Sequence, residues 1–263
     1  MKELATLALV LIAASAAIQA VAALRKSPRP DPASHWLLAA AGANLVVLII
    51  LRSASISFPA LTGTFESLVF YATVLCAVAV AYRLQRRLPF LPLVQFGGTI
   101  AILALLAVAS SPIAPKDLLA PIPALRSGWL VAHVALSFIG ESFFVVGFVS
   151  SLCWLRSRDE AKRRDYDRLT YTSIALGYPV FTAGALVFGM VWAYRAWGSW
   201  WSWDPKETWA LVTWLVYTVF LHVRLTRRRS GALPAWISVI GFACTVFTFF
   251  GVNYLLSGLH SYR

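Results

Sequence analysis

The feature that most constrains this chain is a series of long apolar runs separated by short polar segments. Crossing a hydrocarbon core of about 30 Å takes about 20 helical residues. Because backbone polar groups in lipid must be satisfied internally, such runs are predicted to be helices. The predicted helices span residues near 4–24, 34–51, 66–82, 94–110, 128–155, 169–194, 208–224 and 233–255. We therefore expect an all-α fold, a polytopic transmembrane helical bundle of about eight helices forming a single domain over residues 1–263.

The charges support this prediction and orient the chain in the bilayer. Only 13% of the residues are charged, whereas a soluble domain carries about a quarter, so the soluble globular class is excluded. Most of the 23 lysines and arginines follow the first, third, fifth and seventh apolar runs, at residues 25–29, 83–87, 156–168 and 224–229. Basic clusters of this kind mark cytoplasmic loops, so the net charge of +12 does not indicate a nucleic-acid partner. Both termini are predicted to lie outside.

The loop between the sixth and seventh apolar runs, residues 195–208, is rich in tryptophan and faces outward in this topology. Its four clustered tryptophans are Trp197, Trp200, Trp201 and Trp203. Tryptophan is enriched at membrane interfaces in any case, but this density exceeds what an aromatic belt needs and favours binding. Asp204 also has a structural explanation as the N-cap of the seventh helix, followed by Pro205 at its first position and Glu207 reaching back. Capping and binding are compatible, because the cap fixes where the loop lies.

Two histidines are predicted on the same side as the Trp-rich loop. His133 lies near the outer end of the fifth helix and His260 near the C-terminus. Neutral imidazoles are good axial ligands for haem iron, and large aromatic faces cover a porphyrin. The combination predicts a haem site, with Arg195 or Arg126 as candidates for holding the propionates. Either histidine taken alone would more often be an ordinary interfacial residue.

A third histidine, His222, lies deeper in the predicted bundle. It is roughly 20 Å farther along the seventh helix than Trp209, at about 1.5 Å per residue, and so too far to ligate the same iron as the outer pair. An ionisable residue at this depth is a functional candidate, but snorkelling beside Arg224 explains it equally well. His35 reads as an interfacial residue, and Glu141 as a buried acid without an obvious partner. There is no CxxC or CxxCH motif.

The Trp-rich segment also resembles a known signature. The run Trp197–Leu211, WGSWWSWDPKETWAL, resembles the WWD domain of haem-handling proteins. Together with the ending Leu255–Tyr262, LLSGLHSY, it resembles the CcsA (ResC) family of system II cytochrome c-type biogenesis. Supporting matches are Phe58–Phe70, Ala175–Pro179 and the alanine–histidine pair that ends at His133. The resemblance covers nearly the whole chain.

This resemblance implies a function and assigns residues to it. His133 and His260 would be the axial ligands of haem b, which is both substrate and ligand, and His222 would help to hold haem inside the membrane. A separate membrane chain, CcsB (ResB), would be the partner. The two would act as a cytochrome c synthase, or haem lyase, that presents haem to the CxxCH of apocytochrome c on the outer face of a bacterial plasma membrane, with a thylakoid-type membrane as the alternative. The resemblance also assigns haem contacts to Trp197, Trp200, Trp201, Trp203 and Asp204.

Three other functions fit parts of the pattern. A CcmC-like haem chaperone shares the Trp-rich loop but has fewer helices and lacks the DPKETW and GLHSY features. A b-type membrane electron-transfer cytochrome pairs histidines across helices at similar depth, whereas His133 and His260 bracket an outer loop. A small-solute transporter would use the loop as a gate. Redox cycling with quinol would favour the cytochrome, and absence of haem from the purified protein would favour the transporter.

Overall fold

The computed structural model describes residues 1–25, 31–89, 91–227 and 230–256. These residues form helices and connecting segments without any strand, and eight of the helices are long and apolar enough to cross a membrane. The all-helical, multi-pass prediction is therefore confirmed. The chain divides into two compact units, Met1–Arg126 and Ser127–Arg263, which we call unit 1 and unit 2. The expectation of a single domain, and of both termini outside, stays a prediction.

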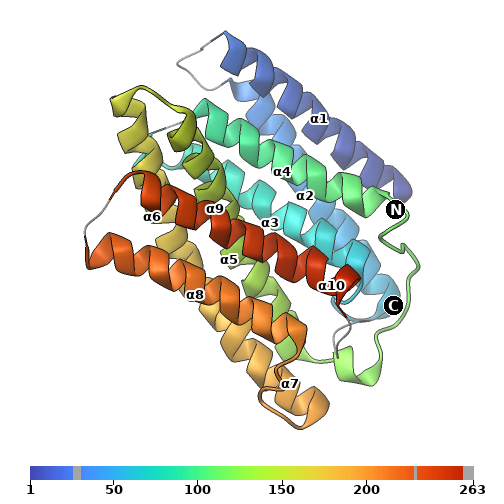
Figure 1. Cartoon of the computed structure of the whole chain (residues 1–263). Coiled ribbons are helices and arrows are strands. Elements are labelled where there is room, and N and C mark those ends of the chain that lie inside the picture. Colours follow the sequence, from blue (N-terminus) through green and yellow to red (C-terminus); the bar gives the residue numbers. More distant parts are fainter. Residues whose placement is uncertain (26–30, 90, 228–229, 257–263) are drawn as a thin grey trace. The chain divides into compact units, whose positions relative to one another are not determined.

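Unit 1 is a closed four-helix bundle (Figure 1). Each helix packs against the next one along the chain, and the fourth packs against the first. The helices are α1 (Lys2–Leu24), α2 (Pro32–Ile56), α3 (Thr64–Leu84) and α4 (Pro92–Ser110), followed by an irregular segment with one 3-10 turn, η1 (Pro123–Leu125). Fully buried leucines and isoleucines fill the interior, among them Ile12, Leu38, Leu45, Leu68, Leu75 and Ile102.

Polar side chains join three helices of unit 1 near the predicted cytoplasmic end. Ser15 of α1 donates a hydrogen bond to the Ser34 carbonyl of α2 at 2.7 Å. Gln19 donates to Ser15 and accepts from Thr99 of α4, both at 3.0 Å. His35 also lies in this region and is buried, and its interpretation as an ordinary interfacial residue stays a prediction. The neighbouring Trp36 is the exposed one of the two.

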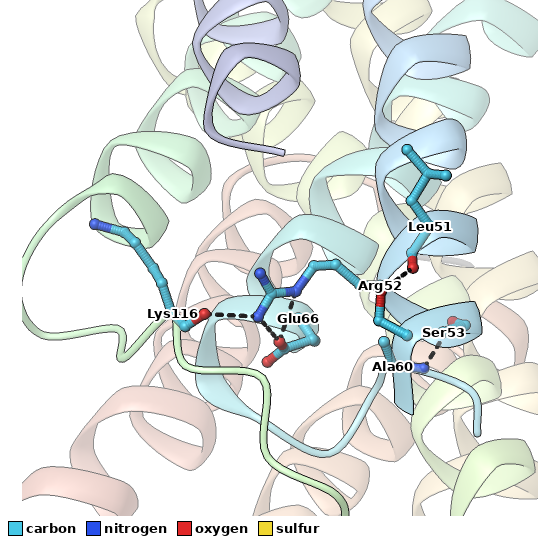
Figure 2. A network of polar contacts seen from close by, with 7 residues as sticks. Leu51, Arg52, Ser53, Ala60, Glu66 and Lys116 are labelled. Carbon is cyan, nitrogen blue, oxygen red and sulfur yellow. Dashed lines mark hydrogen bonds and ion pairs between the residues drawn. The ribbon is translucent and has the colours of Figure 1, made fainter. Parts of the chain in front are cut away.

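The other end of unit 1 holds a buried ion pair (Figure 2). The Arg52 guanidinium of α2 donates two hydrogen bonds to one carboxylate oxygen of Glu66 on α3, the Nε contact being 2.8 Å. It also donates to the Lys116 carbonyl at 3.0 Å and covers the Phe65 ring at 4.6 Å. A buried charge is tolerated only when it is paired and hydrogen-bonded. This pair therefore fastens the segment after α4 to α2 and α3.

Among the described residues, unit 2 contains the other four candidate spans, whose helices are drawn in Figure 1. Its elements are α5 (Gly128–Arg156), α6 (Glu160–Phe181), η2 (Thr182–Phe188), α7 (Gly189–Trp197), α8 (Pro205–Leu225), α9 (Ala232–Val246), η3 (Phe247–Gly251) and α10 (Val252–Leu255). The segments η2 and η3 are π-helical turns inside longer helices, so that α6, η2 and α7 form one continuous span, Glu160–Trp197. This span begins earlier than the sequence predicted, because the charged residues before 169 are helical too.

Close packing of α5 against α6 forms the core of unit 2. A Cβ placed on Gly177 would lie 2.7 Å from the Gly140 carbonyl oxygen, so glycine is needed at this crossing. Farther along, the rings of Phe144 on α5 and Tyr217 on α8 stack with centroids 3.8 Å apart. Helix α9 closes the arrangement by packing against both α5 and α8. Together these contacts place α5 and α8, the two helices that carry His133 and His222, in one packed unit.

Candidate functional site

The Trp-rich loop is held at both of its ends. Gly198 adopts a φ of 76° and ends α7, a left-handed conformation that glycine accommodates without strain. At the other end Asp204 accepts a hydrogen bond from the Lys206 N–H at 2.9 Å, which confirms the predicted N-cap. Glu207 also reaches back, and its carboxylate accepts hydrogen bonds from the backbone N–H of Ser202 at 2.8 Å and from the Ser202 hydroxyl at 3.1 Å. The loop is thus tied to the first turn of α8.

The tryptophans of this loop present broad aromatic surface to the outside of the chain. Trp200 stacks on Tyr194 with centroids 4.4 Å apart, while Trp201 and Trp203 meet edge to face at 5.8 Å. Trp203 is 69% exposed and has a φ of 58°, which is unusual for a bulky residue. The indole N–H of Trp201 is buried and finds no hydrogen-bond partner within the described part of the chain. Such a surface can accept a flat apolar ligand.

His133 is joined to this loop through Trp192. Its ring lies parallel to Trp192, with centroids 6.3 Å apart and planes 9° apart. Trp192 is buried and meets Trp197 edge to face at 6.0 Å. The structure therefore brings one predicted ligand, His133, into a continuous series of aromatic contacts with the Trp-rich loop. His260 lies outside the described residues, so its pairing with His133 stays a prediction.

The protonation of His133 follows from its hydrogen bond. Nδ1 lies 2.9 Å from the carbonyl oxygen of Gly184 in η2. Because a carbonyl only accepts, Nδ1 must carry the proton and the lone pair of the neutral ring is on Nε2. Metal-binding histidines commonly donate their second N–H to such a group, which fixes the tautomer and the ring orientation. No pattern in the sequence indicated this contact.

His222 lies in the last turn of α8, two residues before Arg224, its expected neighbour near the inner headgroups. Arg224 pairs with Asp167 of α6 at 2.8 Å and covers the Tyr171 ring at 5.2 Å. His222 is exposed, with Nδ1 3.4 Å from the Thr226 hydroxyl. It continues a stripe of exposed apolar residues on the same face, Leu215 and Val219. The His222 imidazole therefore lies on the outer surface of the chain, on the same face of α8 as these apolar side chains.

The two arginines that were named as propionate candidates lie in different units. The Arg195 guanidinium is 5.9 Å from the ring centroid of Trp129, which precedes His133 by one turn of α5. Arg126 follows η1 at the end of unit 1. Nothing in the contacts of either residue assigns it an anionic ligand, and both stay candidates.

The prediction of Glu141 as a buried acid without an obvious partner is confirmed. Glu141 of α5 is buried, and its Oε2 has no hydrogen-bond partner among the described residues. In the same unit, the Lys206 ammonium of α8 donates a hydrogen bond to Asn253 of α10 at 3.2 Å. In the sequence Lys206 appeared only as part of the cap that follows Asp204. The position of Lys206 in the first turn of a membrane helix was the signal that its long side chain could turn toward a neighbouring helix.

Fold and site together define a multi-pass helical membrane protein in which an exposed tryptophan loop adjoins an imidazole with a fixed tautomer. The family model described as Cytochrome C assembly protein matches residues 61–260. The Cytochrome c biogenesis protein CcsA of a strain of Prochlorococcus marinus is 34% identical over 266 residues, covering 86% of this chain and 82% of that protein. The chain therefore belongs to the CcsA family of cytochrome c assembly proteins.

Two further comparisons show how much of each similar protein this chain covers. The CcsA protein of Chlamydomonas reinhardtii is 40% identical over 234 residues, which cover 83% of this chain but only 65% of that protein. Among solved structures, "Cytochrome c Heme Lyase CcmF" matches 97% of this chain and 46% of its own chain, with a TM-score of 0.73 and 18% identity. The second likeness shows a shared fold. This chain thus spans about two thirds of the Chlamydomonas reinhardtii protein and about half of the CcmF chain.

Proposed function

We propose that this chain is the haem-handling subunit of a system II cytochrome c synthase. It receives haem b and presents it on the outer membrane face for thioether attachment to the CxxCH of apocytochrome c. The observation that carries the proposal is the placement of His133, with its proton held by Gly184 and its ring in line with the Trp-rich loop. The names of the relatives, which are cytochrome c biogenesis proteins, support it.

In this proposal the outer site binds haem b through one ligand from each end of unit 2. His133, through Nε2, and His260 would hold the haem iron, as the family resemblance implies. Trp197, Trp200, Trp201 and Trp203 cover the ring, and Asp204 fixes the loop by capping α8. The protein contributes orientation and control of the iron environment, so the chain needs no acid–base residue of its own.

His222 has a separate part in the proposal. An imidazole exposed on a lipid-facing stripe is unfavourable unless it meets a partner or a ligand. The exposed face around Leu215, Val219 and His222 therefore supports a contact with a second membrane chain, the CcsB (ResB) partner. His222 and a histidine of that partner would hold haem within the membrane before it reaches the outer site. The proposed location is the plasma membrane of a bacterium.

Variants of the two outer histidines test the proposal. The chain is purified together with its partner from cells that make haem, and the haem content and the maturation of a reporter cytochrome c are measured. We expect a His133→Ala, His260→Ala double variant to lose most of both. His35→Gln, which changes a histidine of unit 1, serves as the control and should keep both. Unchanged haem content in the double variant would contradict the ligand assignment.

A further inference from the structure

The π-helical turn η2 has an unusual position between the site and the core of unit 2. It spans Thr182–Phe188 and follows Pro179, whose missing N–H already weakens the helix at this point. A π turn closes hydrogen bonds from residue i to i+5 and so widens the helix by comparison with the i to i+4 pattern. Such turns are rare and often occur at functional sites.

On one side η2 contacts His133. The Gly184 carbonyl accepts from the Gly189 N–H, in the wide pattern of the turn, and also from His133 Nδ1. A Cβ on Gly189 would lie 3.1 Å from that same Nδ1. A Cβ on Gly184 would overlap the backbone of Leu136 and Ser137 on α5. A side chain at Gly184 would therefore push the turn away from α5, and one at Gly189 would press on the imidazole.

On the other side η2 is anchored to α8. The indole N–H of Trp214 donates to the Thr182 hydroxyl at 3.0 Å, and that hydroxyl donates to the Tyr178 carbonyl at 2.7 Å. The Tyr178 ring stacks on Trp214 with centroids 5.7 Å apart, and its hydroxyl pairs with Thr218 at 2.7 Å. Thr182 is the first residue of the turn, so these bonds fix where the turn begins.

We propose that η2 is the device that positions His133 as an iron ligand, and that Thr182 and Trp214 are positioning residues acting through the Gly184 carbonyl. The inference rests on the proposed function, because it takes His133 to bind haem iron. A histidine that donates its second N–H to a fixed acceptor is a more basic ligand, held in one orientation. Losing the Trp214 anchor lets the Gly184 carbonyl move away from Nδ1 and loosens the ring.

The test uses variants that remove one hydrogen-bonding group while keeping the shape of the side chain. Trp214→Phe removes the donor, and Thr182→Val removes the acceptor. Haem is titrated into the purified complex with the partner, and affinity, spin state and midpoint potential are recorded. We expect about tenfold weaker binding at the outer site, the lower end of the effect seen for partners of metal-bound histidines. The midpoint potential should rise, because a less basic ligand stabilises oxidised iron less.

Two controls separate positioning from general stability. Thr182→Ser keeps the hydroxyl and should retain the wild-type affinity and potential. Trp236→Phe changes an exposed tryptophan of α9 in the same way as Trp214→Phe and should alter neither. If Trp214→Phe does not fold, Thr182→Val supplies the same measurement from the acceptor side.

The deciding experiment removes the ligand whose orientation is in question. In a His133→Gly background, added imidazole is expected to restore the bis-imidazole spectrum. Adding Trp214→Phe to this background should then change haem affinity by no more than about twofold, since His133 is no longer there to be positioned. A full tenfold loss in that background would overturn the inference, and so would wild-type affinity and potential in Trp214→Phe alone. If the wild-type complex binds no haem, the proposed function itself fails, which is a distinct result.

Discussion

The two units of the chain differ in the regularity of their helices and in how their buried carboxyl groups are held. In unit 1 the helices α1 to α4 are regular along their described lengths, and the buried charges of Arg52 and Glu66 satisfy one another (Figure 2). In unit 2 two helices contain π turns, and the buried Glu141 lacks a direct hydrogen-bond partner among the described residues. Irregular helices and unsatisfied buried groups cost stability. Both π turns lie in unit 2, the unit that carries His133 and the Trp-rich loop, while buried polar atoms without a described hydrogen-bond partner occur in both units, at His35 and Gln95 in unit 1 and at Glu141 and Trp201 in unit 2.

The largest expected effect comes from breaking the ion pair of unit 1. Arg52→Met leaves the Glu66 carboxylate buried without its partner, which should cost about 3–5 kcal/mol of stability. Thermal unfolding in detergent measures the loss. Replacing both partners, Arg52→Met with Glu66→Leu, should recover most of it, because no buried charge remains. The exposed pair Arg163–Glu160 provides the control, where Glu160→Gln should change stability by about 0.5 kcal/mol or less. Equal effects at the two pairs would contradict the burial argument.

A second, smaller loss is expected at the glycine crossing of unit 2. Gly177→Ala places a methyl group 2.7 Å from the Gly140 carbonyl oxygen, so α5 and α6 must move apart. Overpacking of this kind costs about 1–3 kcal/mol, which the same unfolding measurement detects. Gly98→Ala in α4 is the matched control, because its Cβ meets nothing within 4 Å. That variant should be neutral or slightly stabilising, and a loss as large as that of Gly177→Ala would show that helix distortion, not contact, is responsible.

Glu141 sharpens the contrast between the units. Glu141→Gln replaces a buried carboxyl group that makes no direct ion pair with an uncharged amide of the same shape, so stability should stay within about 1 kcal/mol of the wild type or rise. The matched variant in unit 1, Glu66→Gln, breaks a direct pair and should be clearly destabilised. Both are measured in one unfolding series. A loss at Glu141→Gln as large as at Glu66→Gln would mean that Glu141 is held by contacts that match those of Arg52 and Glu66.

The smallest effect on stability is expected in the loop itself. Trp203→Gly removes an exposed side chain from a residue with a φ of 58°, a conformation that glycine adopts readily. Stability should change by about 0.5 kcal/mol or less, whereas haem uptake should fall. Trp236→Ala, which removes an exposed tryptophan from α9, is the control and should leave haem uptake intact. Unchanged haem uptake in Trp203→Gly would remove this residue from the proposed site.

Much of the fold could be predicted from the sequence, because long apolar runs and a capping pattern are local signals. The eight spans and the Asp204 cap are both confirmed. The π turns could not be predicted, since one wider turn leaves no mark on the apolar pattern, and Pro179 was the sole hint of irregularity in its helix. The contact between His133 and Gly184 joins residues on different helices and depends on that turn. The hydrogen bond from the Lys206 ammonium to Asn253 was not predicted, because the helices around a first turn decide where its side chains point.

The ligands of the outer iron can be measured by electron paramagnetic resonance of the oxidised complex. The account predicts a low-spin bis-imidazole signal in the wild type that gives way to a high-spin signal in His133→Ala. A wild-type signal from other axial ligands, or one that His133→Ala leaves unaltered, would contradict it.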